Sequence, residues 1–215
     1  IAADQYPYIA GGTGLDATVP TWVFNQGLDT ALEILRDPGM RDQLKTEIMN
    51  PDSDRLVVAV GGWKGIVLAN PQVPEYEEHV GKNFEEIGQA LSKDPADAAW
   101  DLMLQALPNR AYAFYYLMSE DDVRKFMQQP WVSIGSDAGA AAVLGEVDDL
   151  GLPHPRSYGT FPRIIAKYVR DEGVLGLEDA IRKMTSWPAS RMKLQDRGLL
   201  VPGYWADVVI FDFDT

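Results

Sequence analysis

Cysteine is absent from this 215-residue chain. Its absence excludes disulfides, iron–sulfur clusters and any cysteine ligand or nucleophile. It leaves the cellular compartment open, with the cytoplasm as the expected location. Histidine is also scarce: the chain has two, too few to be taken as a metal site by themselves.

Positive charge is in short supply as well. Nineteen lysines and arginines face 32 aspartates and glutamates, which gives a net charge of −13. Nucleic-acid backbones and anionic lipids are also negatively charged, so neither is an expected partner. A small molecule is the expected partner instead. No apolar run approaches the ~20 residues that span a bilayer. The opening residues, IAADQYPY, lack the basic and apolar regions of a signal peptide.

Several motifs of common enzyme classes are missing. The sequence has no GxxxxGK[ST], no strand–GxGxxG–helix unit, no GxSxG and no HExxH. P-loop kinases, Rossmann dehydrogenases, elbow-type serine hydrolases and zincins are therefore disfavoured. The sequence is 46% hydrophobic and 24% charged. This composition predicts a globular protein with one substantial core and room for a smaller lobe.

Hydrophobic patterning predicts helices alternating with short strands, which is typical of α/β folds with parallel strands. Strands are predicted at 1–3, 56–60, 66–68, 111–118, 132–135 and 206–213. Helices are predicted to begin near 29, 38, 83, 94, 119, 160, 177 and 188. The glycines of 11–14 predict a loop, and residues 138–159 a long connection. The segment from about 28 to 128 is too long for one βα crossover, so it predicts an inserted subdomain.

Asp137 is the sharpest candidate for chemistry. It follows the apolar strand 132–135 and lies close to Gly135, where a backbone can approach a ligand. Polar residues at the carboxyl ends of strands are where a (β/α)8 barrel carries its chemistry. The Ser-Asp-Ala-Gly sequence suits a turn or a helix cap equally well, so both interpretations stay open.

Several other polar side chains are candidates for binding. Arg156 suits a bidentate contact with a carboxylate, and His154 is stiffened by a proline on each side. Both could instead bond loop carbonyls. Tyr6 and Thr13, together with Tyr8, surround the first glycine segment and could line a pocket or simply pack near a strand end. His79, among glutamates, is assigned to the solvated surface.

The order of these motifs resembles the D-aminoacylase branch of the amidohydrolase superfamily, the N-acyl-D-amino-acid deacylases. The resemblance is carried by DQYPYxAGGTGL, WKGI, GSDAG, HPRSYGTFPR, LEDAIRKMTSWPASRMKLQDRGLL and PGYWADVVIFD. It implies the last part of a metal-bearing (β/α)8 barrel over residues 1–197. Residues 1–3 would be the seventh barrel strand and 132–135 the eighth, with 198–215 the first strand of the return to a small β-sandwich.

The resemblance also implies an activity, which is metal-dependent hydrolysis of the amide bond of N-acyl-D-amino acids. Asp137 would transfer the proton of the attacking water and could share in binding one or two zinc ions. Arg156, Tyr6 and Thr13 would hold the substrate α-carboxylate. His154 would orient Arg156 or stabilise the oxyanion.

Two departures from the family pattern leave substrate preference open. Ala138 stands where the family usually has glycine, and the stretch from Asp137 to His154 is longer than usual. The family's metal-binding histidines and cysteine would precede Ile1, in a missing N-terminal portion or a second chain. This chain alone is therefore expected to be inactive and to self-associate through its exposed strand edges. The alternatives are a dihydroorotase- or hydantoinase-like cyclic amidase, and a non-catalytic subunit that partners a catalytic chain.

Overall fold

The computed structural model describes residues 2–51, 56–139 and 152–214, which fall into two compact units. The first unit comprises Ile1–Ile9, Met118–Ala141 and Pro155–Thr215, and the second Ala10–Leu117 and Ala142–His154. Each has its own buried apolar core. Within these described ranges, no helix has the length and apolar character needed to cross a membrane.

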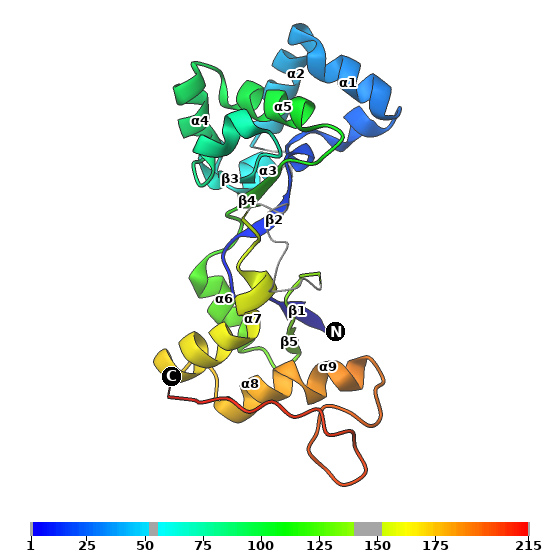
Figure 1. Ribbon diagram of the computed structural model, residues 1–215, viewed down its shortest axis with the longest axis vertical. Helices are drawn as coiled ribbons and strands as arrows, with labels where there is room; N and C mark the ends of the chain where they lie inside the picture. Colours follow the sequence, from blue (N-terminus) through cyan, green and yellow to red (C-terminus); the bar gives the residue numbers. More distant parts are fainter. Residues whose placement is uncertain (1, 52–55, 140–151, 215) are drawn as a thin grey trace. The chain divides into compact units, whose positions relative to one another are not determined.

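The first unit is built on a short parallel sheet. Strands β1 (Ala3–Gln5) and β5 (Val132–Ile134) lie side by side, with Ala3 opposite Val132 and Gln5 opposite Ile134 (Figure 1). Its helices are α6 (Glu120–Met127), α7 (Arg156–Arg163), the π-helix η6 (Ile164–Asp171), α8 (Leu177–Met184) and α9 (Ser186–Arg191). Its core contains Val123, Met127, Ile134, Ile164, Tyr168, Leu175 and Ala180. The parallel pairing that the α/β pattern predicts is confirmed for these two strands. However, β1 begins at Ala3 and ends at Gln5, so it overlaps the predicted 1–3 at one residue only, and Ile1 lies outside the described residues.

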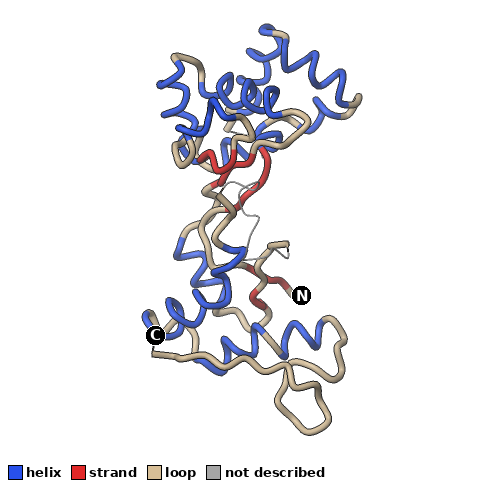
Figure 2. Tube along the Cα trace, in the orientation of Figure 1, coloured by secondary structure: helices blue, strands red, loops and turns tan. Residues whose placement is uncertain are grey.

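The second unit has an antiparallel sheet in the order β2–β4–β3, so the prediction of parallel strands is wrong here. The two groups of red strands in Figure 2 are these two sheets. The strands are β2 (Gly11–Gly14), β3 (Ile66–Asn70) and β4 (Tyr112–Tyr115). The helices are η1 (Leu15–Thr18), η2 (Thr21–Phe24), α1 (Leu28–Arg36), α2 (Pro38–Ile48), α3 (Leu56–Ala59), η3 (Trp63–Gly65), η4 (Pro74–His79), α4 (Phe84–Leu91) and α5 (Pro95–Ala106).

The glycines of 11–14 form strand β2 rather than the predicted loop. They are needed because larger side chains from the neighbouring strand region lie across them. A Cβ on Gly12 would overlap the Tyr112 ring, and one on Gly14 would overlap Arg110. These glycines therefore reflect a close approach of side chains to a strand, which is a second use of glycine beside turns.

Residues 56–60 were predicted as a strand, and this is wrong, because they form helix α3. A short apolar run fits a buried helix and a buried strand equally well. The two glycines that follow decide the matter. The Gly62 N–H donates to the Val57 carbonyl at 2.8 Å and the Gly61 N–H to Val58 at 3.0 Å, with positive φ at both glycines. This is the Schellman arrangement that ends helices.

Helix starts were predicted well because their capping side chains are local. Asn83 and Glu86 form the reciprocal capping box expected before α4. The Asp94 carboxylate accepts from the Ala96 N–H ahead of Pro95, which begins α5. Ser119 likewise caps α6 through the Asp122 N–H.

Helix α6 buries Val123 and Met127 in the core, while Phe126 is 52% exposed. One prediction for the next helix needs correction. The connection predicted to reach residue 159 ends earlier, since α7 begins at Arg156 and Pro155 precedes it. The last four residues of the HPRSYG motif are thus helical.

Residues 206–213 were predicted as a strand, but they do not form one. Val209 and Ile210 are 84% and 93% exposed, as expected for an apolar segment that pairs with no strand among the described residues. The predicted return to a β-sandwich and the predicted self-association stay predictions.

A buried lysine binds the backbone at the start of β5. Lys183 of α8 has no exposed surface, and its ammonium donates to the Gln129 carbonyl and, at 2.9 Å, to the Val132 carbonyl. Burial lowers the pKa of this amine, partly opposed by Asp179. The lysine therefore ties α8 to the turn between α6 and β5, the strand that leads to Asp137.

A second polar link joins α6 to η6. Glu120 accepts hydrogen bonds from Lys167 at 2.7 Å and from the Tyr168 hydroxyl at 2.8 Å. Burial alone would raise the pKa of the Glu120 carboxyl, but these hydrogen bonds and the charges of Lys167 and Arg163 hold it below its ordinary value. The carboxylate is thus favoured in its ionised form.

We expect Lys183→Met to lower the free energy of unfolding by about 1–3 kcal/mol, because two carbonyls lose their buried donor. Denaturant titration of the protein measures this. Lys125→Met is the matched control, since Lys125 is exposed on α6, and it should change stability by no more than about 0.5 kcal/mol. Equal effects of the two substitutions would contradict the role given to Lys183.

Glu120 should make the free energy of unfolding depend on pH in the acidic range. Because the pKa of its carboxyl is lower in the fold than in the unfolded chain, its stabilisation is complete above the unfolded pKa and is lost as pH falls through the folded one. The stability difference between wild type and Glu120→Gln should therefore be largest near neutral pH and shrink below about pH 4. Urea titrations of both proteins across this range measure it. A difference that does not change with pH would refute it.

Candidate functional site

Strands β1 and β5 present polar residues at one edge of their parallel sheet. Tyr6 directly follows β1, and Asp137 follows β5 after Gly135 and Ser136. The Gly135 N–H donates to the Gln5 carbonyl at 3.0 Å, so the pairing continues to the end of both strands. Since parallel strands end at the same edge, these side chains are brought together although about 130 positions separate them in the chain.

The Asp137 backbone adopts a left-handed conformation, with φ of 48°. This region is uncommon for residues other than glycine, although aspartate tolerates it better than most. The side chain is 71% exposed, and one oxygen lies 3.1 Å from an Nη atom of Arg156. The carboxylate is therefore open to solvent on one side and paired with a cation on the other.

Burial holds the Arg156 side chain in place, and its guanidinium faces the Asp137 carboxylate. It is the first residue of α7 and only 8% exposed. Its guanidinium carbon lies 4.8 Å from the centre of the Tyr6 ring, a cation–π contact. Tyr6, Asp137 and Arg156, three of the residues predicted from sequence, thus come together in one unit.

Thr13 and His154 belong to the other unit. Thr13 lies in β2, and its hydroxyl accepts from Arg110 at 3.3 Å, while Arg110 also pairs with Asp16 at 2.6 Å. His154 is buried, and its Nε2 is 2.7 Å from the Ala10 carbonyl, which requires a proton on that nitrogen. Its ring packs edge-on against Phe114. The substrate-binding roles predicted for Thr13 and His154 stay predictions.

His79 was assigned to the surface, and this is wrong, because it is only 5% exposed. Its ring packs against Tyr76, and its Nδ1 lies 3.3 Å from the Lys82 amine. The neighbouring glutamates suggested that His79 would be exposed to solvent. Instead, the 3-10 helix η4 turns the histidine inward, while Glu75, Glu77 and Glu78 stay exposed.

Sequence inspection missed Arg163, which contacts Tyr8, a residue predicted to line a pocket or to pack near a strand end. The Tyr8 hydroxyl donates to the Pro155 carbonyl at 3.3 Å, and its ring lies 5.0 Å from the Arg163 guanidinium. Burial raises the pKa of the Tyr8 hydroxyl, and the charge of Arg163 partly opposes this rise. Arg163 lies seven positions after Arg156 in the same motif, which on a helix means the same face. That spacing could have revealed it.

The described residues do not make a metal site by themselves. Among them, no three histidine, aspartate or glutamate side chains converge as a metal ion would require. Asp137 could supply at most one ligand, and the nearby Arg156 guanidinium opposes a second positive charge there. The other ligands would have to come from residues outside those described.

The arrangement is suited to chemistry on an anionic substrate. A solvent-exposed carboxylate can accept a proton, and a buried guanidinium can bind a carboxylate with good geometry. Tyr6 adds an aromatic ring to this edge of the sheet.

Comparison with known proteins gives consistent results. Residues 122–215 match the model of the Amidohydrolase family. The N-acyl-D-glutamate deacylase of Alcaligenes xylosoxydans xylosoxydans is 35% identical over 189 residues, which are 88% of this chain and 33% of that protein. The D-aminoacylase of the same organism is 37% identical over 137 residues, 64% of this chain and 25% of that protein. The chain thus spans about a third or less of these relatives.

A solved structure agrees with the sequence comparisons. The N-acyl-D-glutamate deacylase of Bordetella bronchiseptica, in complex with zinc and a phosphonate inhibitor that mimics the tetrahedral intermediate, has a TM-score of 0.65 and 28% sequence identity. The match covers 100% of this chain and 33% of that protein. The chain therefore belongs to the amidohydrolase family, in the branch that contains the D-aminoacylases.

Proposed function

We propose that the protein containing this chain hydrolyses the amide bond of N-acyl-D-amino acids and releases a carboxylic acid and a free D-amino acid. The observation that carries this proposal is the group of Asp137, Arg156 and Tyr6 at the edge of the β1–β5 sheet. The similarity to proteins named as D-amino-acid deacylases supports the same substrate class.

In this proposal Asp137 moves a proton. Its carboxylate accepts a proton as a water molecule adds to the amide carbonyl, and returns it to the nitrogen as the C–N bond breaks. The new C–O bond stays with the acyl product, and the amine leaves with the transferred proton. The exposure of the carboxylate supports this role, because water can reach it.

Arg156 and Tyr6 are proposed to hold the α-carboxylate of the substrate. The guanidinium offers several N–H donors, and burial of the side chain fixes where they point. The contact with Asp137 supports this assignment, since it shows that a carboxylate oxygen can approach the guanidinium to 3.1 Å. Substrate binding would then weaken the hold of Arg156 on Asp137 and leave that carboxylate to act as a base.

A metal cofactor, zinc in one or two ions, is part of the proposal. A bound zinc ion polarises carbonyls and lowers the pKa of water. The described residues supply at most one carboxylate toward it, so most ligands would lie elsewhere in the assembled protein. We also propose that β1 and β5 are the last two strands of a (β/α)8 barrel.

A substrate panel tests the function. The complete, metal-loaded protein should hydrolyse N-acetyl-D-glutamate, N-acetyl-D-aspartate or N-acetyl-D-leucine at least about 100-fold faster than the L-enantiomers, measured as kcat/KM. Hydantoin and dihydroorotate should not be hydrolysed. Turnover of the cyclic amides alone would favour a cyclic amidase. No turnover of any amide by correctly loaded protein would favour a non-catalytic subunit.

Asp137→Asn should lower kcat by about 10²–10⁴-fold, because an amide cannot accept and return the proton. Thermal unfolding should be nearly unchanged, since the side chain is exposed. Asp42→Asn provides the matched control, because Asp42 is 80% exposed on α2 and pairs only weakly with Lys45 at 3.7 Å. Wild-type kcat in Asp137→Asn would exclude the proposed proton transfer.

A further inference from the structure

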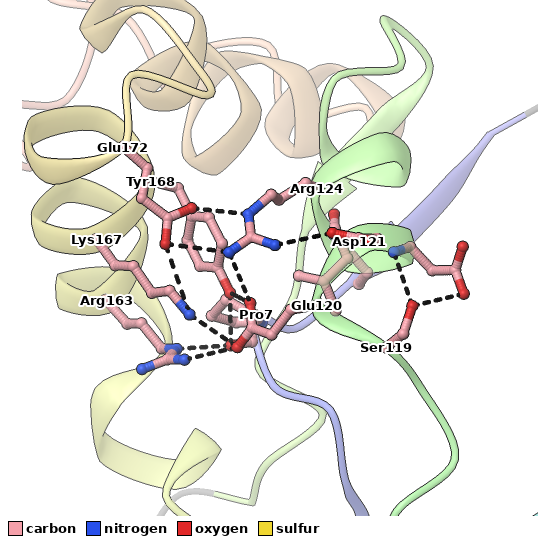
Figure 3. A network of polar contacts seen from close by, with 12 residues as sticks. Pro7, Ser119, Glu120, Asp121, Arg124, Arg163, Lys167, Tyr168 and Glu172 are labelled. Carbon is pink, nitrogen blue, oxygen red and sulfur yellow. Dashed lines mark hydrogen bonds and ion pairs between the residues drawn. The ribbon is translucent and has the colours of Figure 1, made fainter.

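The carbonyl of Pro7 lies at the centre of a polar network in the first unit (Figure 3). It accepts from Arg163 Nε at 2.7 Å and, more weakly, from the Tyr168 hydroxyl at 3.5 Å. Glu120 binds both donors, with Oε1 at 3.2 Å from an Nη of Arg163 and Oε2 accepting from Tyr168 at 2.8 Å. Glu120 therefore orients the two groups that hold this carbonyl.

The local helix type lets these donors converge. Arg163 is the last residue of α7, and the chain continues as the π-helix η6. A π-helix has more than four residues per turn, so Arg163, Lys167 and Tyr168 fall on one face and meet Glu120 there. Single π turns are frequent at functional sites.

The Pro7 carbonyl is a fixed backbone group close in sequence to Tyr6. Proline has no N–H and a fixed φ, so its carbonyl is its one backbone group able to hydrogen-bond. Pro7 is buried and directly follows Tyr6. Fixing this carbonyl sets the peptide plane after Pro7 and limits how far the Tyr6 ring can move relative to Arg156.

The same network reaches Arg156 by a second route. The Arg163 guanidinium lies 5.0 Å from the Tyr8 ring, and the Tyr8 hydroxyl donates to the Pro155 carbonyl at 3.3 Å. Pro155 immediately precedes Arg156. The space for this hydroxyl exists because residue 159 is glycine, and a Cβ there would overlap the Tyr8 oxygen.

We propose that Glu120 and Arg163 are positioning residues for the candidate site. Through Pro7 they hold Tyr6, and through Tyr8 they hold the start of α7, so that Tyr6 and Arg156 stay in contact and Arg156 is ready for the substrate carboxylate. The inference rests on the proposed function for its catalytic meaning, while the positioning itself does not require activity.

The network also contains a matched control. Glu172 pairs with Arg124 at 2.8 Å and with Lys167 at 3.8 Å, on the side of the network away from Pro7 (Figure 3). Glu172 directly follows η6 and pairs with α6, so Glu172→Gln removes a carboxylate from the same region without removing a partner of Arg163.

The test compares Glu120→Gln, Gly159→Ala and Glu172→Gln in the complete protein. Gly159→Ala displaces Tyr8 from the α7 side, and alanine is favourable within a helix, so the fold should persist. Glu120→Gln and Gly159→Ala should each raise KM by about tenfold with kcat within about threefold, the signature of lost substrate binding. Glu172→Gln should leave KM within about twofold.

Hydrogen exchange gives a readout that does not need activity. In Glu120→Gln and Gly159→Ala, amides of residues 156–160 should exchange at least about tenfold faster, whereas Glu172→Gln should match wild type there. An inactive wild type would overturn the proposed function, and exchange would still decide the positioning. The inference is overturned if residues 156–160 exchange as in wild type in both test variants, or if Glu172→Gln shows the same KM and exchange changes as they do.

Discussion

The pairing of β1 with β5 is the constraint on which the candidate site depends. Three residues on each strand bring together segments that are far apart in sequence, with Ala3 opposite Val132. So short a sheet cannot be stable by itself. It is supported by the apolar core of α6, η6 and α8 and by the buried Lys183 amine, which holds the carbonyl of Val132.

From this sheet edge the chain builds a site in layers. Tyr6 and Asp137 extend from the strand ends, and Arg156 reaches both from the start of α7. Behind them, Arg163 donates to the Pro7 carbonyl, and Glu120 accepts from Arg163. Positioned groups of this kind matter because a displacement of about 1 Å can cost a hundredfold in rate. Although the whole chain is acidic, the site contains a largely buried cation, Arg156, which suits a small anionic substrate.

The sequence predicted those features whose cause is local. The caps at Asn83 and Asp94 fixed the starts of α4 and α5, because a side chain and a backbone N–H three or fewer residues apart decide them. Asp137 and Arg156 were named as candidates from a strand end and a motif, and their roles stay predictions. The errors occurred where distant contacts decide. Residues 56–60 fit a helix or a strand, and Gly12 was taken as a loop glycine although it makes room for Tyr112.

The supporting groups of the site could not be read from the sequence for the same reason. Glu120 looks like an ordinary first-turn acid on α6, and only the fold brings it to Arg163 and Tyr168. His79 looked solvated among glutamates and is buried. Local sequence patterns predict helix ends and candidate catalytic residues. The partners of a polar or charged side chain inside the fold depend on tertiary packing, which such patterns do not show.

The most direct test of the central claim is a crystal structure of the complete protein with an inert N-acyl-D-amino-acid analogue bound. The account predicts the analogue's α-carboxylate within hydrogen-bonding distance of Arg156, its acyl carbonyl beside Asp137, and the contact between Arg156 and Tyr6 retained. An analogue held by other residues, with Arg156 still bound to Asp137 and remote from the carboxylate, would contradict it.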